Sequence, residues 1–320
     1  MFVTRENIHP VVLKLATTTC VVALLPISMG ALVTTLQAGM AFADWPSSDG
    51  HNMLLYPWFR DFAANPDKFT EHGHRLAGML IGFVSVCLAV SSYVFERRWV
   101  KWFTTAILLA VIAQGALGGA RVLLDRQLLA MLHSITGAAF FSLCVGFRLM
   151  CSSKWCVWRT QRDDRVNPLF ASLIALTPVI ISTQYVLGGV LRHFHTMLDE
   201  HIAGALIVSL CGSLAAIGLI RSQNLLLRKS GLMMIVALML QVALGAGSFV
   251  TKFGLQQIGY VAVSGSLSQT VTCSMHTVVG MFLLSSSVVG ATSLAVLFRG
   301  GCLAGLQNEL PTVRNRRTVA

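Results

Sequence analysis

The chain has 320 residues with a hydrophobic content of 55%, and charged residues make up only 12% of it. Soluble domains carry about twice that share of charge, which argues against a water-soluble enzyme or DNA-binding protein and excludes a disordered chain. The formal net charge of +11 suggests nucleic acid as a partner, but the positions of the charges give another explanation. Composition therefore predicts an all-α polytopic membrane protein.

Eight apolar stretches recur along the chain, each close to the roughly 20 residues that a helix needs to cross a bilayer. Because backbone groups cannot stay unpaired in lipid, all eight are predicted to be helices. They cover residues 12–36, 72–95, 102–123, 128–150, 169–191, 196–220, 229–250 and 272–298. The first stretch also resembles a signal peptide that ends at Ala41-Phe42-Ala43, but it is long enough to span and is predicted as the first transmembrane helix.

Basic residues are distributed unevenly between the two sides of this topology. With the N-terminus inside, 17 of the 24 lysines and arginines fall in inner segments and 7 in outer ones. The positive-inside rule produces this pattern, so the net charge needs no nucleic-acid partner. The sequence predicts a plasma-membrane protein in contact with lipid, with both termini cytoplasmic. The basic segment 314–317 is interpreted as a topology signal rather than a lipid-binding site.

The eight cysteines predict no disulfide framework. Four lie within predicted spans, three on the reducing side, and only Cys273 lies near the outer face, without a partner there. All eight are interpreted as small apolar fillers.

The two halves of the chain resemble each other. His133 and His276 are offset by 143 positions, which predicts about 16 extra residues before the last helix, and Gln37 and Gln184 form a fainter pair. The pairs offset by 127 positions are His74 with His201, Gln114 with Gln241 and Gly118 with Gly245. This duplication predicts two pseudo-symmetric four-helix bundles arranged as parallel repeats. The expected domains are residues 1–150, a cytoplasmic linker 151–168, the second half 169–298 and a basic tail 299–320.

Four histidines are expected at one depth because even-numbered helices all begin on the outer side. Each precedes a glycine by three or four residues on the same helical face, which leaves room for a flat ligand. Two histidines from neighbouring helices suit bis-imidazole haem ligation; zinc is less favoured because most of them have no cysteine or carboxylate nearby. The alternative is a set of hydrogen-bonding helix contacts. The candidates are His74, His133, His201 and His276, followed by Gly78, Gly137, Gly204 and Gly280.

Glu71 lies one turn before His74 on the same helical face, where it could stabilise positive charge developing on a substrate. The alternative is an i,i+4 ion pair between Glu71 and Arg75, and Arg75 could also hold a propionate. Outer-loop residues Arg192 and His193, with His195, are interpreted as propionate or proton-relay groups, or as solvated loop residues.

At these residues the sequence resembles the haem A synthase family, which serves cytochrome c oxidase assembly. The resemblance runs from about residue 30 to 290. It is carried, in order, by Gly39-Met40-Ala41 with Asp44-Trp45-Pro46, Glu71-x-x-His74-Arg75, Gln114-x-x-Leu117-Gly118-Gly119, His133, the Gln184 to His193 stretch, His201 and His276. Many relatives carry paired cysteines in the outer loops, and this chain does not.

The resemblance implies an oxidoreductase that converts the C8 methyl group of haem O to the formyl group of haem A by successive hydroxylations. It implies a haem b held by His201 and His276, and a substrate haem O facing His74 and His133, with Glu71 as the catalytic carboxylate beside His74 and Arg75. Haem O synthase and terminal oxidase assembly factors are the implied partners, and a homo-oligomer stays open. The alternatives are a di-haem b-type electron-transfer cytochrome, which has no use for Glu71, and a transporter with histidine proton relays.

Overall fold

The computed structural model describes residues 7–153, 155 and 167–309. Within them, eight helices are long and apolar enough to cross a membrane, which confirms the predicted all-helical, multi-pass fold. They are α1 (Pro10–Thr35), α3 (Pro66–Phe95), α4 (Arg98–Leu124), α5 (Gln127–Met150), α7 (Pro168–Phe194), α8 (Leu198–Ile220), α9 (Leu225–Phe253) and α10 (Leu267–Glu309). Short turns Trp58–Arg60 and Gln256–Ile258 and helix α2 (Asp61–Ala64) lie in the connections.

Helix α3 begins at Pro66, six residues before the predicted start, so His74 lies two turns inside the helix rather than at its opening. The apolar pattern misses these residues because the first turns are polar. Their helical start is set by capping: the Asn65 side chain accepts a hydrogen bond from the Lys68 amide, and proline occupies the first helical position. Most of the predicted linker 151–168, and the tail from residue 310, lie outside the described residues.

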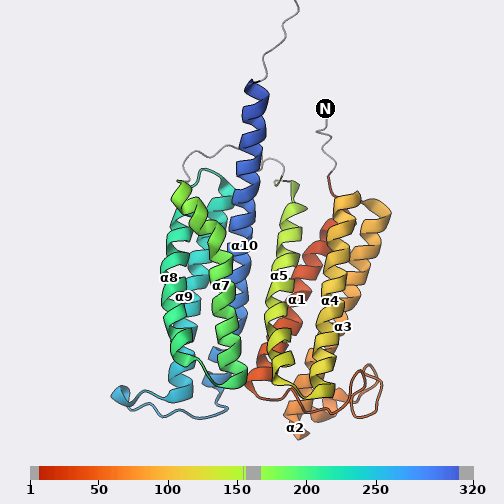
Figure 1. The fold of residues 1–320 in the computed structure, drawn as a ribbon. Helices are drawn as coiled ribbons and strands as arrows, with labels where there is room; N and C mark the ends of the chain where they lie inside the picture. Colours follow the sequence, from red (N-terminus) through yellow and green to blue (C-terminus); the bar gives the residue numbers. More distant parts are fainter. Residues whose placement is uncertain (1–6, 154, 156–166, 310–320) are drawn as a thin grey trace, which may run out of the picture.

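The eight long helices pack as two groups that lie side by side (Figure 1), and the contacts within each group of four close into a ring of helices. In the first ring α1 packs on α3, α3 on α4, α4 on α5, and α5 on α1. In the second, α7 packs on α8, α8 on α9, α9 on α10, and α10 on α7. Helices α1 and α5 meet α10, and α5 meets α7, at the junction between the rings. Two four-helix bundles thus lie side by side, as the duplication suggests.

The junction between the bundles is compatible with a pseudo-twofold axis along the helices. If α1 corresponds to α7 and α5 to α10, the α1–α10 and α5–α7 contacts exchange under such an axis, and the α5–α10 contact lies on it. Ser142 on α5 and Ser285 on α10 are offset by 143 positions, the same as His133 and His276. Their hydroxyl oxygens lie 3.0 Å apart in a hydrogen bond. A contact between residues at corresponding positions is compatible with such an axis.

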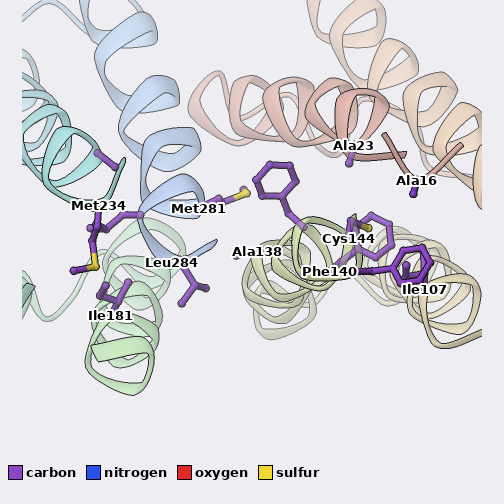
Figure 2. Packing of buried hydrophobic residues seen from close by; sticks show 14 of the residues in the cluster. Ala16, Ala23, Ile107, Ala138, Phe140, Cys144, Ile181, Met234, Met281 and Leu284 are labelled. Carbon is purple, nitrogen blue, oxygen red and sulfur yellow. The ribbon is translucent and has the colours of Figure 1, made fainter. Parts of the chain in front are cut away.

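The bundle interiors combine small side chains with larger apolar ones (Figure 2). Ala138 is fully buried and Cys144 is 1% exposed, beside the larger Phe140. No disulfide joins the cysteines within the described part of the chain, and burial raises the pKa of the Cys151 thiol to about 12. These cysteines therefore act as the small fillers that the sequence predicted.

The outward faces of the helices are apolar. Phe83 and Val90 on α3, Leu206 on α8 and Met239 on α9 are each more than half exposed. A water-soluble protein rarely exposes so many large apolar side chains together, whereas lipid tails solvate them. The protein is therefore a multi-pass membrane protein.

Gly231 on α9 allows the close approach of α8. A Cβ at this position would lie 2.8 Å from the Ala216 carbonyl oxygen and 2.8 Å from Leu219 Cβ. We expect Gly231→Ala to destabilise the fold by about 1–3 kcal/mol, because backbone must move to admit the methyl group. Thermal unfolding in detergent measures this loss. Gly82→Ala is the matched control, since a Cβ there would meet nothing within 4 Å; equal midpoints for the two variants would contradict the packing argument.

Candidate functional site

One histidine pair lies in each bundle. In the first bundle His74 on α3 faces His133 on α5, with ring centroids 6.0 Å apart and ring planes at 89°. In the second, His201 on α8 faces His276 on α10, with centroids 6.3 Å apart and planes at 84°. The expectation that partners come from neighbouring helices is wrong: α3 and α5 lie diagonally across one ring, and α8 and α10 across the other. Diagonal placement brings the side chains together at the bundle centre.

Each histidine ring packs against a glycine on one of the other two helices of its bundle. These glycines are needed for the close approach, because a Cβ would lie only 3.0 to 3.4 Å from the ring carbon Cε1. The pairs are Gly30 with His74, Gly118 with His133, Gly188 with His201 and Gly245 with His276. All four rings present the same edge to their glycine, so the two sites repeat one design.

Gly30 was missed as a site residue. The sequence comparison paired Gln37 with Gln184, but the environment of Gly30 matches that of Gly188, since each faces the first histidine of its half. The available signal was its position: Gly30 and Gly188 both lie one to two turns before the end of their helix. Gly39, which follows α1, contacts Arg121 instead.

The glycines predicted to leave room beside the rings have different surroundings in the two halves. A Cβ at Gly78 or Gly137 would meet nothing within 4 Å, so the first site has open space there. In the second half, the Gln184 side chain covers Gly204, and Gln241 covers the corresponding glycine of α10. The duplicated sites therefore differ in what fills them.

The Nδ1 atoms of the rings have few partners, whereas Nε2 of His276 lies 3.4 Å from the side-chain amide of Gln241. Nδ1 of His74, His133 and His276 is buried without a hydrogen bond among the described residues. Backbone carbonyls four residues before the facing glycines lie beside these three rings. Nδ1 of His201 instead lies 3.0 Å from the Gln184 side-chain amide. Carbonyl or amide groups next to Nδ1 are the usual outer contacts of a histidine that binds a metal through Nε2.

The geometry of both pairs fits axial ligation of one metal ion between two imidazoles. Metal–imidazole bonds are about 2 Å long, and the ring radius is just over 1 Å, so two rings on opposite sides of a metal have centroids roughly 6 Å apart. The observed values are 6.0 and 6.3 Å. No group of three or more metal-binding side chains occurs in residues 7–153 and 167–309. Two ligands per site suit a haem, whose macrocycle supplies the other four, and not a structural zinc ion.

Glu71 is fully engaged in the structure. Its Oε1 lies 2.8 Å from Arg75 Nη2 in a buried i,i+4 ion pair, which the sequence left as an alternative. Its Oε2 accepts hydrogen bonds from the backbone amides of Ala41 and Phe42, at 2.7 and 3.3 Å. Glu71 therefore holds the loop between α1 and α3 against α3, one turn from His74.

Arg75 extends this network into the loop. Its Nη1 donates to the carbonyl oxygens of Asp44 and Ser47, at 2.9 and 2.7 Å, and its guanidinium lies 4.9 Å from the centroid of the Phe42 ring. Because these acceptors and Glu71 occupy the guanidinium, Arg75 has little capacity left for the propionate considered from the sequence. It ties the loop to the helix.

The aromatic residues of the first outer loop divide into anchors and exposed groups. The Trp58 ring stacks on Phe69, and its Nε1 donates to the Phe69 carbonyl at 2.8 Å. The Trp45 ring lies against Gly119 at the end of α4. Tyr56 donates to Asp61, and burial together with this bond raises the pKa of Tyr56. Only part of the cluster therefore faces outward as a membrane belt would.

Arg192 crosses the junction between the bundles. From α7 it donates to the Ala31 carbonyl at 2.6 Å, to Thr35 Oγ1 at 3.0 Å and to Thr277, next to His276. Its neighbour His193 lies 3.4 Å from Ser134 Oγ, next to His133. His195, which ends α7, is exposed. The first two are therefore built into the junction rather than solvated loop residues.

The fold defines a polytopic membrane protein with one pair of facing histidines in each bundle. Residues 64–200 match the COX15-CtaA family, described as "Cytochrome oxidase assembly protein". The chain is 28% identical over 131 residues to Heme A synthase of Methylobacterium radiotolerans, which is 38% of this chain and 35% of that protein. It is 30% identical over 132 residues to the Paracoccus denitrificans protein of that name (39% and 34%), and 32% identical over 127 residues to the Cereibacter sphaeroides one (34% and 31%).

The matched segment covers about a third of the length of these relatives. The family match includes Glu71, Arg75 and both histidines of the first bundle, and it ends one residue before His201. The motif order in the sequence agrees with it. Over this segment the chain is similar to the COX15-CtaA family and to proteins named Heme A synthase.

Replacing Arg75 with methionine should destabilise the protein by about 3–5 kcal/mol, because it leaves the buried carboxylate of Glu71 without its cation. Lys68→Met is the matched control. It removes the more exposed ion pair with Asp49 and should cost much less stability, because water screens an exposed pair. Thermal unfolding in detergent ranks the two variants. If Lys68→Met destabilised the protein as much as Arg75→Met, the large effect of Arg75→Met could not be attributed to burial of the Glu71–Arg75 pair.

Proposed function

We propose that this protein is a haem A synthase, an oxidoreductase that converts the C8 methyl group of haem O to the formyl group of haem A for cytochrome oxidase assembly. The observation that carries the proposal is the pair of bis-imidazole sites, one in each bundle, with the spacing of axial ligands. The similarity to proteins named Heme A synthase supports the choice among haem proteins.

The second bundle takes the resident haem b in this proposal, with His201 and His276 as its axial ligands. Gln184 and Gln241 fill the space beside these rings, and the Gln184 amide contacts His201 Nδ1. Side chains packed around a site in this way suit a cofactor that stays in place, because they fix the orientation of the ligands.

The first bundle takes the substrate, haem O, between His74 and His133. The space beside Gly78 and Gly137 is open, which suits a macrocycle that must enter and leave. The outer loop held by Glu71 and Arg75 covers this end of the bundle (Figure 1). These two features support the assignment of substrate to the first half.

Glu71, His74 and Arg75 form the proposed catalytic group. A haem b bound in the second bundle supplies a one-electron carrier within the membrane. His74 positions the substrate, and the Glu71 carboxylate lies one turn away, where a fixed negative charge stabilises positive charge that develops as the methyl group is oxidised. Arg75 holds that carboxylate in place. The loop contacts already hold the Glu71 carboxylate in place, so the carboxylate needs no rearrangement during the reaction.

The proposed setting is the plasma membrane, with both termini in the cytoplasm and the haem sites towards the outer face. Haem O synthase would supply the substrate, and terminal oxidase assembly factors would receive the product. The concentration of basic residues on the side of the termini supports this orientation.

Co-expression with a source of haem O tests the proposal, with haem extraction, chromatography and a reduced-minus-oxidised spectrum as the readouts. We expect haem b in the purified protein and new haem A only when this chain is present. Glu71→Gln should lower haem A formation by about 100-fold or more, the usual effect of removing one group that stabilises charge in a transition state, and leave the haem b spectrum intact. Asp199→Asn, at an exposed carboxylate on α8, is the control and should change neither.

Two outcomes would contradict the proposal. Haem b with unconverted haem O would identify an electron-transfer cytochrome, and protein free of haem would show that the histidine pairs are helix contacts. Normal haem A formation by Glu71→Gln would overturn the catalytic role of Glu71 alone.

A further inference from the structure

Three arginines lie within helices near the outer ends of the bundles, and two of them are fully engaged. Arg75 is bound by Glu71 and by loop carbonyls. Arg192 is bound by α1 and α10 across the junction. Arg121 on α4 differs, because no hydrogen bond or ion pair joins its guanidinium to any residue that the structure describes.

Arg121 is placed beside the first histidine pair. It follows Gly118, the glycine that faces His133, by three residues, so both lie on one face of α4. Its guanidinium lies directly against the backbone of Gly39, in space that a Cβ would fill. It is close enough for its positive charge to act on the rings of His74 and His133. The side chain is half-buried, so its hydration is incomplete.

The duplication shows that this cation belongs to the first half only. The residue offset by 127 positions is Ser248 on α9, which has a buried hydroxyl without a hydrogen-bond partner among the described residues. A plain structural role for Arg121 would call for acceptors around it, as Arg192 has. The negative charges of Glu71 and Asp125 act on Arg121 without a hydrogen bond; a half-buried guanidinium that lacks hydrogen-bond acceptors still costs free energy, and an anionic ligand would offset that cost.

We propose that Arg121 binds a carboxylate of the molecule that occupies the first histidine pair. Resting on the proposed function, this group is a propionate of the substrate haem, and the contact fixes how the macrocycle is turned between His74 and His133. Guanidinium groups match carboxylates with two parallel hydrogen bonds. The first site therefore selects macrocycles that carry a free acid at the outer edge, and the second site does not use this residue.

The test compares two probes, iron protoporphyrin IX and its dimethyl ester, on full-length protein already loaded with its resident haem. Absorbance titration measures the affinity of the additional macrocycle. We expect the wild type to bind the diacid about tenfold or more tightly than the diester, as a charged hydrogen bond predicts. Arg121→Gln should remove this preference by weakening the diacid only, and Arg121→Lys should retain part of it.

Arg126→Gln is the matched control, because Arg126 is an exposed cation at the start of α5; it should leave both affinities unchanged. Equal binding of diacid and diester by the wild type would overturn the role of Arg121 while leaving the haem site standing. Equal weakening of both probes by Arg121→Gln would show a structural role and would also overturn it. Binding of neither probe by the wild type would instead reject the proposed function.

Discussion

The contact between an imidazole ring and a glycine on another helix is the constraint on which both sites depend. A histidine at the centre of a four-helix bundle must find room between the two helices that flank it. Gly30 and Gly118 provide that room in the first bundle, and Gly188 and Gly245 provide it in the second. Because the rings then come from diagonal helices, their separation is set by the bundle diameter. Axial spacing for one metal follows from helix packing.

The two copies keep this framework and differ in the groups around it. Gln184 and Gln241 fill the second site, whereas Gly78 and Gly137 border open space in the first. The first copy alone has the buried Glu71–Arg75 pair that ties the outer loop to α3. A duplicated bundle can diverge in this way because its backbone is held by helix packing and each site can exchange its polar groups without changing the fold.

Contacts at the junction hold the two bundles, and with them the two histidine pairs, together. Ser142 on α5 and Ser285 on α10 form a hydrogen bond, and Arg192 joins α7 to α1 and α10. Neighbouring residues of α7, Arg192 and His193, contact the residues that follow His276 and His133. The contacts of Arg192 and His193 therefore lie beside the histidine pairs, whereas Ser142 and Ser285 meet nine residues further along α5 and α10. Ser274 on α10 also donates to Thr35 on α1, so several polar contacts hold the two bundles together.

The sequence by itself determined the eight spans, the duplication and the four histidines, because hydropathy and repeat spacing are local properties of the chain. It could not determine the diagonal pairing of His74 with His133, the role of Gly30, or the acceptors that occupy Glu71 and Arg75. Each of these depends on contacts between residues 28 to 59 positions apart in the sequence, which only helix packing brings together. The same is true of Arg121: its lack of acceptors follows from the surrounding helices and loop, and no neighbouring residue in the sequence reveals it.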